Sequence, residues 1–318
     1  MRHIPGSDLL TTSLGLGCAA LSAGLSRHHN RRLVDAAFLA GIRHFDVAPP
    51  YGMGTAEGVL GEALKGRRHQ VTVTTKVGIA RPRQVRAVML ARSLAAPVRR
   101  VVPQLTRRIG ASTYRGLTAR PSFDPSFVEA SVHESLRLLQ TDYLDILVLH
   151  EVSPADITTE LLDILENLRR TGIVRSLGTA TSYENTHAIS LSHSGFFDVW
   201  QYSWCLLDED RPPLPGFAIT HGSIQRAVAA TRSWLGQQAT RTRRLSDEAG
   251  VDLTLGDNLA HTLLGAALAH NPNGITLVSS RQRRRIESNS TLLTDDTFVR
   301  AGRVLASAFS THHAPAYQ

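Results

Sequence analysis

The amino-acid sequence predicts an α/β protein built as a closed (β/α)8 TIM barrel with a long basic insert after the third strand. Short apolar runs alternate with amphipathic helical stretches along most of the 318 residues, which is typical of parallel βα units. Eight such runs in a chain of this length favour a closed barrel, whose active site lies at the carboxyl ends of the strands. An open doubly wound sheet is the alternative. Its usual Gly-x-Gly-x-x-Gly turn is missing, because Gly15–Ala20 lacks the third glycine.

The eight expected strands are short, and several end at a polar residue or at glycine. They lie at residues 14–18, 44–46, 71–76, 146–149, 176–179, 199–202, 217–220 and 276–278. The third run is strongly β-branched, and the fourth is entirely apolar, as expected for a strand buried on both faces of a parallel sheet.

Helices are expected where apolar residues recur every three to four positions. They cover residues 31–40, 55–64, about 124–139 and 157–170. Thr55 is the expected N-cap of the second helix, and Gly172 is the expected left-handed stop of the fourth. Residues 206–216 are too few and too rich in proline for the helix expected after the sixth strand, so we expect a turn there.

Composition excludes several classes of protein. Hydrophobic residues make up 42% and charged residues 19% of the chain, so we expect one ordered domain, 1–318, ending in a C-terminal helix and tail at 291–318. No run approaches the roughly 18 to 20 apolar residues of a membrane span, and no signal-peptide core opens the chain. We therefore expect a soluble, cytoplasmic protein without a membrane partner. The only cysteines, Cys18 and Cys205, exclude a disulfide framework and a cysteine metal site.

One segment accounts for the net charge of +8. Residues 77–123 hold ten arginines and no acidic residue, so the rest of the chain is close to neutral. Because this insert leaves the carboxyl end of the third strand, we expect a lid over the pocket mouth, whose arginines could meet an anionic substrate. A solvated lid or an oligomer contact is the alternative. We expect no nucleic-acid partner, since no aromatic stacking platform accompanies the arginines.

Four polar residues stand at or just after expected strand ends. Asp46 closes the second strand, Tyr51 follows it, Lys76 closes the third and His150 follows the fourth. Lys76 is one of only two lysines among 35 basic residues, which indicates that a compact ammonium is needed there. This ammonium would favour ionisation of Tyr51, and Asp46 would keep the ammonium charged. His150 could hydrogen-bond a substrate carbonyl oxygen or relay a proton to it, although each residue alone also has a purely structural explanation.

Four blocks of sequence add a more specific signal. They are Ala40–Gly52 (AGIRHFDVAPPYG), Thr75–Gly78 (TKVG), Ser135–His150 (SLRLLQTDYLDILVLH) and Gly172–Gly178 (GIVRSLG). In this order and spacing the chain resembles the aldo-keto reductase superfamily, in particular its bacterial NADP-dependent members, over about residues 13–289.

This resemblance implies a (β/α)8 barrel that binds NADPH in an extended form and needs no metal, with the four polar residues as its catalytic tetrad. It implies reduction of a small aldehyde or ketone to an alcohol, or the reverse, with hydride from the nicotinamide and a proton from Tyr51. The alternative is a catalytically weak NADP-binding barrel that regulates a partner. An oligomer is compatible with either interpretation.

The resemblance also implies a set of cofactor-binding residues. They are Gly17, Cys18, Ala180, Thr181, Gln201, Trp204, Ser280, Arg281, Arg285 and Asn289. The sequence departs from the family pattern at several places: Ala180 and Thr181 replace a Ser–Asn pair, Trp204 and Cys205 replace a Tyr–Asn pair, residues 220–223 replace a Ser-Pro-Leu loop, and Ser279 replaces a glycine. Trp204 could stack near the nicotinamide or pack in the core. Four arginines at 281–285 favour NADP over NAD, with a solvated basic turn as the alternative.

Overall fold

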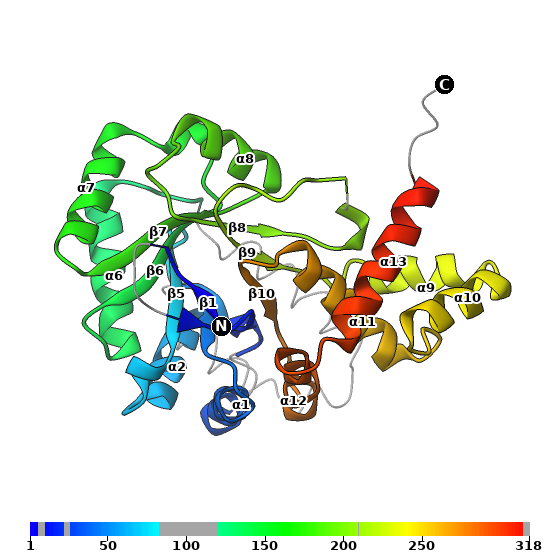
Figure 1. Cartoon of the computed structure of the whole chain (residues 1–318). Helices are drawn as coiled ribbons and strands as arrows, with labels where there is room; N and C mark the ends of the chain where they lie inside the picture. Colours follow the sequence, from blue (N-terminus) through cyan, green and yellow to red (C-terminus); the bar gives the residue numbers. More distant parts are fainter. Residues whose placement is uncertain (6–9, 22–25, 83–119, 209, 314–318) are drawn as a thin grey trace, which may run out of the picture.

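Eight parallel strands close into a barrel in a computed structural model that describes residues 1–5, 10–21, 26–82, 120–208 and 210–313. Their order around the barrel is β10–β3–β4–β5–β6–β7–β8–β9, which confirms the predicted (β/α)8 barrel (Figure 1). The strands are β3 (Leu14–Gly17), β4 (His44–Asp46), β5 (Thr72–Val77), β6 (Leu144–His150), β7 (Val174–Ala180), β8 (Val199–Ser203), β9 (Phe217–His221) and β10 (Ile275–Val278). All eight overlap the ranges predicted from the sequence.

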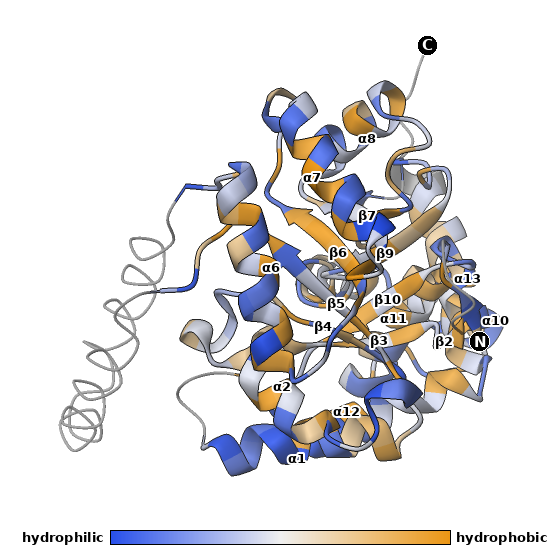
Figure 2. Ribbon diagram, turned by 90° about the vertical axis from the view of Figure 1, so that its left-hand side faces the viewer, coloured by the Kyte–Doolittle hydropathy of each residue, from blue (hydrophilic) through white to orange (hydrophobic). Residues whose placement is uncertain are grey.

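Helices lie around the barrel and beside it, and those around it turn apolar faces toward the strands (Figure 2). They are α1 (Arg27–Leu39), α2 (Ala56–Leu64), α6 (Pro125–Leu139), α7 (Thr159–Arg170), α8 (Tyr183–Ser192), α9 (Val228–Gly236), α10 (Ala239–Ala249), α11 (Gly256–His270), α12 (Arg283–Ser290) and α13 (Thr297–His313). None of the helices among the described residues is both long enough and apolar enough to cross a membrane.

Three local predictions have clear outcomes. After β8 the structure describes a single 3-10 turn, Leu206–Asp208, in place of a helix, as the sequence predicts. Gly172 has a φ of +76° directly after α7 and so provides the predicted left-handed stop. Thr55 takes the predicted N-cap position of α2, but its side chain makes no capping bond. Its hydroxyl donates to the carbonyl oxygen of Gly52 at 2.7 Å, because a tight 3-10 turn leads directly into α2 and uses this hydroxyl instead.

The chain start closes one end of the barrel, which the sequence analysis did not predict. A short antiparallel pair, β1 (Arg2–His3) and β2 (Leu10–Thr11), carries Ile4 into the apolar cluster of the barrel interior. Ser176, near the start of β7, donates a hydrogen bond to the Pro5 carbonyl oxygen. These contacts lie at the amino ends of the strands, so they leave the carboxyl ends open.

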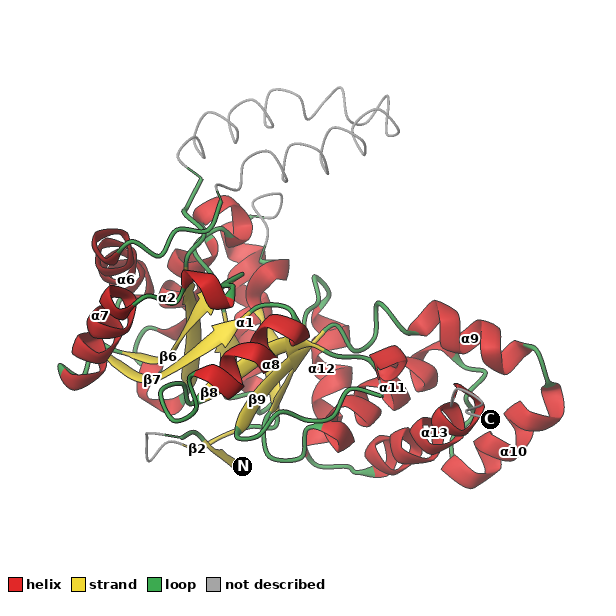
Figure 3. Cartoon of the chain, turned by 90° about the horizontal axis from the view of Figure 1, so that it is seen from above, coloured by secondary structure: helices red, strands yellow, loops and turns green. Residues whose placement is uncertain are grey.

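A second apolar core lies beside the barrel. It is formed mainly by α9, α10, α11 and α13, and Trp234 packs edge-on against Phe309 with ring centroids 5.2 Å apart. Figure 3 shows this group of helices to one side of the strands. The arrangement accounts for the long stretch of chain between β9 and β10, and α11 leads from this core back to β10.

The basic insert begins directly after β5, as predicted. Residues 83–119 lie outside the described residues, so the predicted lid over 77–123 stays a prediction. The described start of the insert is fixed by Arg81, which pairs with the Glu57 carboxylate of α2. Glu57 is only 1% exposed and also accepts a hydrogen bond of 2.7 Å from the Thr75 hydroxyl. A buried carboxylate thus ties the first turn of the insert to the strand that carries Lys76.

A buried charge cluster joins three strands near their amino ends. Asp145 on β6 pairs with Arg68 at 2.7 Å and with Arg175 at 3.0 Å. Its carboxylate also accepts the backbone N–H of Val73 at 2.8 Å. Both guanidinium groups lie over the ring of Tyr143, at 4.3 Å and 3.9 Å from its centroid. Asp145 therefore links β5, β6 and β7.

Replacing Asp145 with alanine should lower the free energy of unfolding by about 3 kcal/mol, because it leaves partly buried guanidinium groups without a counter-charge. Urea denaturation measures this loss. Asp142→Ala, at an exposed position three residues earlier, is the matched control and should change stability by less than about 0.5 kcal/mol. Equal losses in the two variants would contradict the prediction.

Candidate active site

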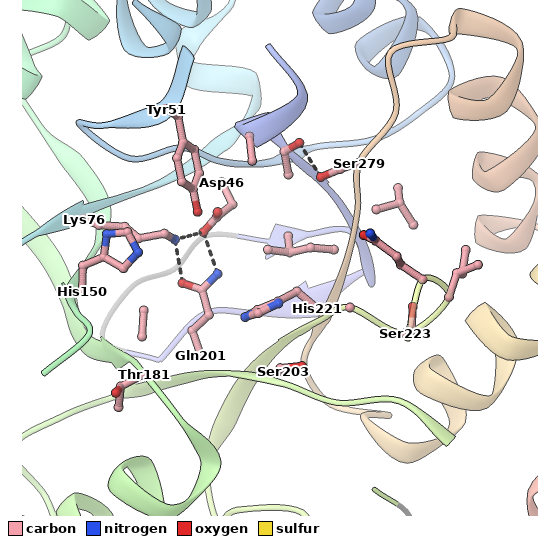
Figure 4. Close-up of a pocket in the computed structure, with 18 of the residues that line it drawn as sticks. Asp46, Tyr51, Lys76, His150, Thr181, Gln201, Ser203, His221, Ser223 and Ser279 are labelled. Carbon is pink, nitrogen blue, oxygen red and sulfur yellow. Dashed lines mark hydrogen bonds and ion pairs between the residues drawn. The ribbon is translucent and has the colours of Figure 1, made fainter. Parts of the chain in front are cut away.

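A pocket of 620 Å³ opens at the carboxyl ends of the barrel strands. Every barrel strand contributes at least one residue to its wall, as expected for the functional end of this fold. The strand residues that line it are Gly17, Asp46, Lys76, His150, Ala180, Gln201, Ser203, His221, Leu277 and Val278. Tyr51 joins them from the loop after β4, so the structure brings all four predicted catalytic residues together (Figure 4).

A closed triangle of hydrogen bonds forms the floor of the pocket. Lys76 Nζ donates to Asp46 Oδ2 at 2.6 Å and to Gln201 Oε1 at 2.7 Å. Gln201 Nε2 donates to the same oxygen of Asp46 at 2.9 Å. The three side chains are only 2%, 2% and 3% exposed, so these hydrogen bonds join groups that are shielded from solvent. A charged pair buried this deeply is stable only with such geometry.

Gln201 therefore has a role that the sequence analysis did not give it. The resemblance assigned it to the cofactor, but the structure engages both ends of its amide with Lys76 and Asp46. It holds the ammonium and the carboxylate in place from β8. A polar side chain within an otherwise apolar strand was the available signal.

Tyr51 and His150 stand next to this triangle. Lys76 Nζ lies 5.9 Å from the centroid of the Tyr51 ring, and the rings of Tyr51 and His150 meet edge to face at 6.3 Å and 89°. Nδ1 of His150 is buried and has no hydrogen-bond partner among the described residues. Burial, followed by the charge of Lys76, lowers the pKa of His150 to about 3, so its ring is neutral at neutral pH.

His221 is a pocket residue that the sequence analysis missed. It closes β9 and lies on the Gln201 side of the pocket in Figure 4. Desolvation of its ring, followed by the charge of Lys76, lowers the pKa of His221 below its ordinary value. A histidine that closes a strand is the same signal that identified His150. The sequence analysis placed His221 only in the segment 220–223 that departs from the family pattern.

Glu151 is a second missed pocket residue. It follows β6 directly, and its φ of +57° lies in the left-handed region. This conformation costs a non-glycine residue roughly 1 kcal/mol, and such strain concentrates at functional sites. Its backbone N–H donates to the Ala180 carbonyl oxygen at 2.8 Å. Burial raises the pKa of the Glu151 carboxyl above its ordinary value.

The predicted cofactor residues divide into three groups by position. Gly17, Ala180, Thr181, Gln201 and Asn289 line the pocket. The close approach of β10 to β3 explains the glycine, because a Cβ at position 17 would lie 2.5 Å from Ser279 Oγ. Ser279 Oγ instead donates to the Gly17 carbonyl oxygen at 2.7 Å.

Two predicted cofactor residues lie in the core instead. Cys18 is fully buried, and its thiol faces the Leu16 carbonyl oxygen at 3.7 Å. Trp204 is 2% exposed and stacks on His270, with ring centroids 4.2 Å apart and an interplanar angle of 14°. Neither residue lines the pocket, because both side chains pack among the buried residues of the core. Of the two alternatives for Trp204, the structure shows core packing.

The remaining predicted cofactor residues surround the start of α12, beyond the pocket wall. Arg281 and Arg285 are exposed, and Ser280 Oγ accepts the backbone N–H of Gln282 at 3.0 Å. Gln282, the N-cap of α12, makes no capping bond with its side chain. A helix N-terminus with free N–H groups and two exposed guanidinium groups can hold a phosphate.

No cluster of three or more histidine, cysteine, aspartate or glutamate side chains suited to a metal ion occurs in the described ranges. The polar groups of the pocket instead offer one buried ion pair, the Glu151 carboxyl and several uncharged hydrogen-bonding groups.

Comparisons with known proteins agree with this geometry. The family model described as "Aldo/keto reductase family" matches residues 13–215. An uncharacterized oxidoreductase from Bacillus subtilis is 23% identical, and the match covers 93% of each chain. D-threo-aldose 1-dehydrogenase from a Pseudomonas species is 32% identical, over 54% of this chain and 50% of its own. The crystal structure of an aldo/keto reductase from Klebsiella pneumoniae, in complex with NADP and acetate, has a TM-score of 0.65 at 18% identity and covers 100% of this chain and 98% of its own.

The protonation state of His150 gives a testable prediction. With a folded-state pKa near 3, its imidazole NMR signals should stay constant between about pH 8 and pH 5. The unfolded chain takes up this proton near pH 6.5, so His150 makes the protein less stable as pH falls from about 6.5 toward 3. His150→Gln assigns the signals by their loss. A titration midpoint near 6.5 in the folded protein would contradict the neutral ring.

Proposed function

The chain belongs to the aldo/keto reductase family of oxidoreductases, which act on small carbonyl compounds, and from this premise we propose that it reduces an aldehyde or ketone with NADPH. The reverse oxidation of an alcohol uses the same groups. The observation that carries the proposal is the buried triangle of Asp46, Lys76 and Gln201 beside Tyr51 and His150.

NADPH, when bound, would supply the hydride that the carbonyl carbon receives. Tyr51 gives its phenolic proton to the carbonyl oxygen, and solvent later returns a proton to the phenol. The fixed ammonium of Lys76 stabilises the negative charge that develops on the phenol oxygen. His150, held neutral, donates a hydrogen bond to the substrate oxygen. Asp46 and Gln201 act as positioning residues, since they orient Lys76 and compensate its charge.

The residues present fit an extended dinucleotide. The pocket runs from Tyr51 to Ser279 and Asn289, so one continuous hollow joins the reactive groups to the vicinity of α12. There, the uncapped helix start with Arg281 and Arg285 suits a 2′-phosphate, which favours NADP over NAD. The NADP complex of the Klebsiella protein supports this choice. The family match ends at residue 215, before β9. The proposal of a phosphate site at α12 is therefore argued from the structure of this chain and not from the family match.

One prediction from the proposed function concerns Tyr51. Tyr51→Phe should lower kcat for NADPH-dependent aldehyde reduction by about 10²- to 10⁴-fold, because it removes the proton donor and leaves the ring in place. NADPH oxidation at 340 nm with a panel of aldehydes measures the rate, and fluorescence titration measures NADPH binding in both proteins.

The same pair of proteins separates catalysis from regulation. If parent and Tyr51→Phe bind NADPH equally and neither turns over any carbonyl, the chain is a regulatory NADP-binding barrel. If the parent reduces a carbonyl compound and Tyr51→Phe does so much more slowly, the result supports the proposed enzyme activity.

Another prediction from the proposed function concerns the 2′-phosphate of the cofactor. Alanine at both Arg281 and Arg285 should raise the Kd for NADPH at least tenfold, because two charge-assisted hydrogen bonds are lost. The Kd for NADH, which lacks the 2′-phosphate, should change far less. Arg303→Ala, an exposed arginine on α13, is the control. Equal weakening of NADPH and NADH binding would argue against a phosphate site at α12.

A further inference from the structure

His261 on α11 contacts two consecutive residues near the end of α12. Its Nε2 atom lies 3.1 Å from the hydroxyl oxygen of Ser288, within hydrogen-bond distance. It also shares a hydrogen bond with the side chain of Asn289. The ring packs against Phe298 of α13, with centroids 5.0 Å apart. Asn289 lines the pocket and His261 does not, so His261 reaches the pocket only through its neighbour.

The protonation of His261 indicates which end of the Asn289 amide it meets. Desolvation lowers the pKa of His261 below its ordinary value, so the ring is mainly neutral at neutral pH. The charge of Asp257 and the hydrogen bond with Asn289 oppose this shift. A hydrogen bond raises the pKa of a histidine when the ring donates it. His261 therefore donates, and the amide oxygen of Asn289 accepts.

This bond limits how the Asn289 amide can be oriented. The two ends of an amide have almost the same shape, so hydrogen bonding decides which end takes which place. By donating to the oxygen, His261 occupies one of its two lone pairs and keeps the amide from turning over. The second lone pair and both N–H groups stay available to a ligand.

The position of Asn289 indicates which part of a ligand it meets. It follows Arg285 by four residues on α12, so the two side chains leave the same face of the helix. Arg285 is proposed above to hold the 2′-phosphate, and the ribose that carries this phosphate also carries the adenine base. Adenine presents a donor, its N6 amino group, beside an acceptor, N7, and an asparagine amide can pair with both.

We propose that His261 is a positioning residue for recognition of the adenine base: it fixes the Asn289 amide in the orientation that pairs with adenine and so disfavours dinucleotides with a different base. Hypoxanthine, for example, carries an oxygen in place of the N6 amino group, and this oxygen would face the fixed amide oxygen. The inference rests on the proposed use of NADPH and adds the residue that selects its base.

The experiment compares NADPH with reduced nicotinamide hypoxanthine dinucleotide phosphate, in which hypoxanthine replaces adenine. Fluorescence titration gives both Kd values, and their ratio measures base selection without turnover. We expect the parent to bind NADPH about tenfold more tightly, and His261→Phe to reduce this preference to about twofold, because the released amide can turn its N–H groups toward the oxygen. His261→Leu, which also cannot donate, gives the same comparison if the phenylalanine disturbs packing.

Two further variants separate positioning from a general loss of structure. His261→Gln, whose amide can also donate to the Asn289 oxygen, should restore much of the preference. His133→Phe, at an exposed position on α6, is the matched control and should keep the parental ratio. A parent without a preference, or a preference that stays at the parental value in both His261→Phe and His261→Leu, would overturn the inference and leave carbonyl reduction intact.

Asn289→Ala tests whether His261 acts through the amide. In this background His261→Phe should leave the ratio unchanged, because the group that His261 orients is gone. A further loss of preference in the double variant would overturn the inference, since His261 would then act by another route. A parent that binds neither dinucleotide would instead overturn the proposed NADPH-dependent function.

Discussion

A buried ammonium needs a negative partner, and the carboxyl end of this barrel is arranged around that need. Lys76 on β5 is compensated by Asp46 on β4 and held by Gln201 on β8. In the order of strands around the barrel, β4 and β8 lie four places apart, on opposite sides of an eight-membered ring. The triangle therefore spans the barrel. Only a closed barrel brings these residues within hydrogen-bond distance, because an open sheet would leave β8 far from β4.

The groups around this ion pair suit a reaction in which negative charge develops on an oxygen atom. Desolvation and the charge of Lys76 lower the pKa of His150 to about 3 and that of His221 below its ordinary value, so the His150 ring can offer a polar N–H group without adding charge. The compensated pair contributes a fixed dipole that needs no rearrangement during the reaction.

Local patterns in the sequence predicted the strands and the four candidate catalytic residues, because each polar residue follows its own apolar run directly. Contacts across the barrel were not predictable in this way. Gln201 and Trp204 lie three positions apart on and just after one strand, yet Gln201 faces the ion pair and Trp204 stacks on His270 of a distant helix. The inward packing of Ile4 depends on a hairpin too short to show a period. The left-handed backbone at Glu151 has no sequence signal, since glutamate rarely adopts it.

The link between Glu57, Arg81 and Thr75 has a consequence for how this chain can change over evolutionary time. It fixes the backbone within a few residues of Lys76, on the near side of the long arginine-rich insert. Substitutions, insertions or deletions after Arg81 then affect a segment whose first residues are already held by the buried carboxylate of Glu57. The insert can accumulate charge or change length as an exchangeable module, while the reaction centre a few residues away keeps its geometry.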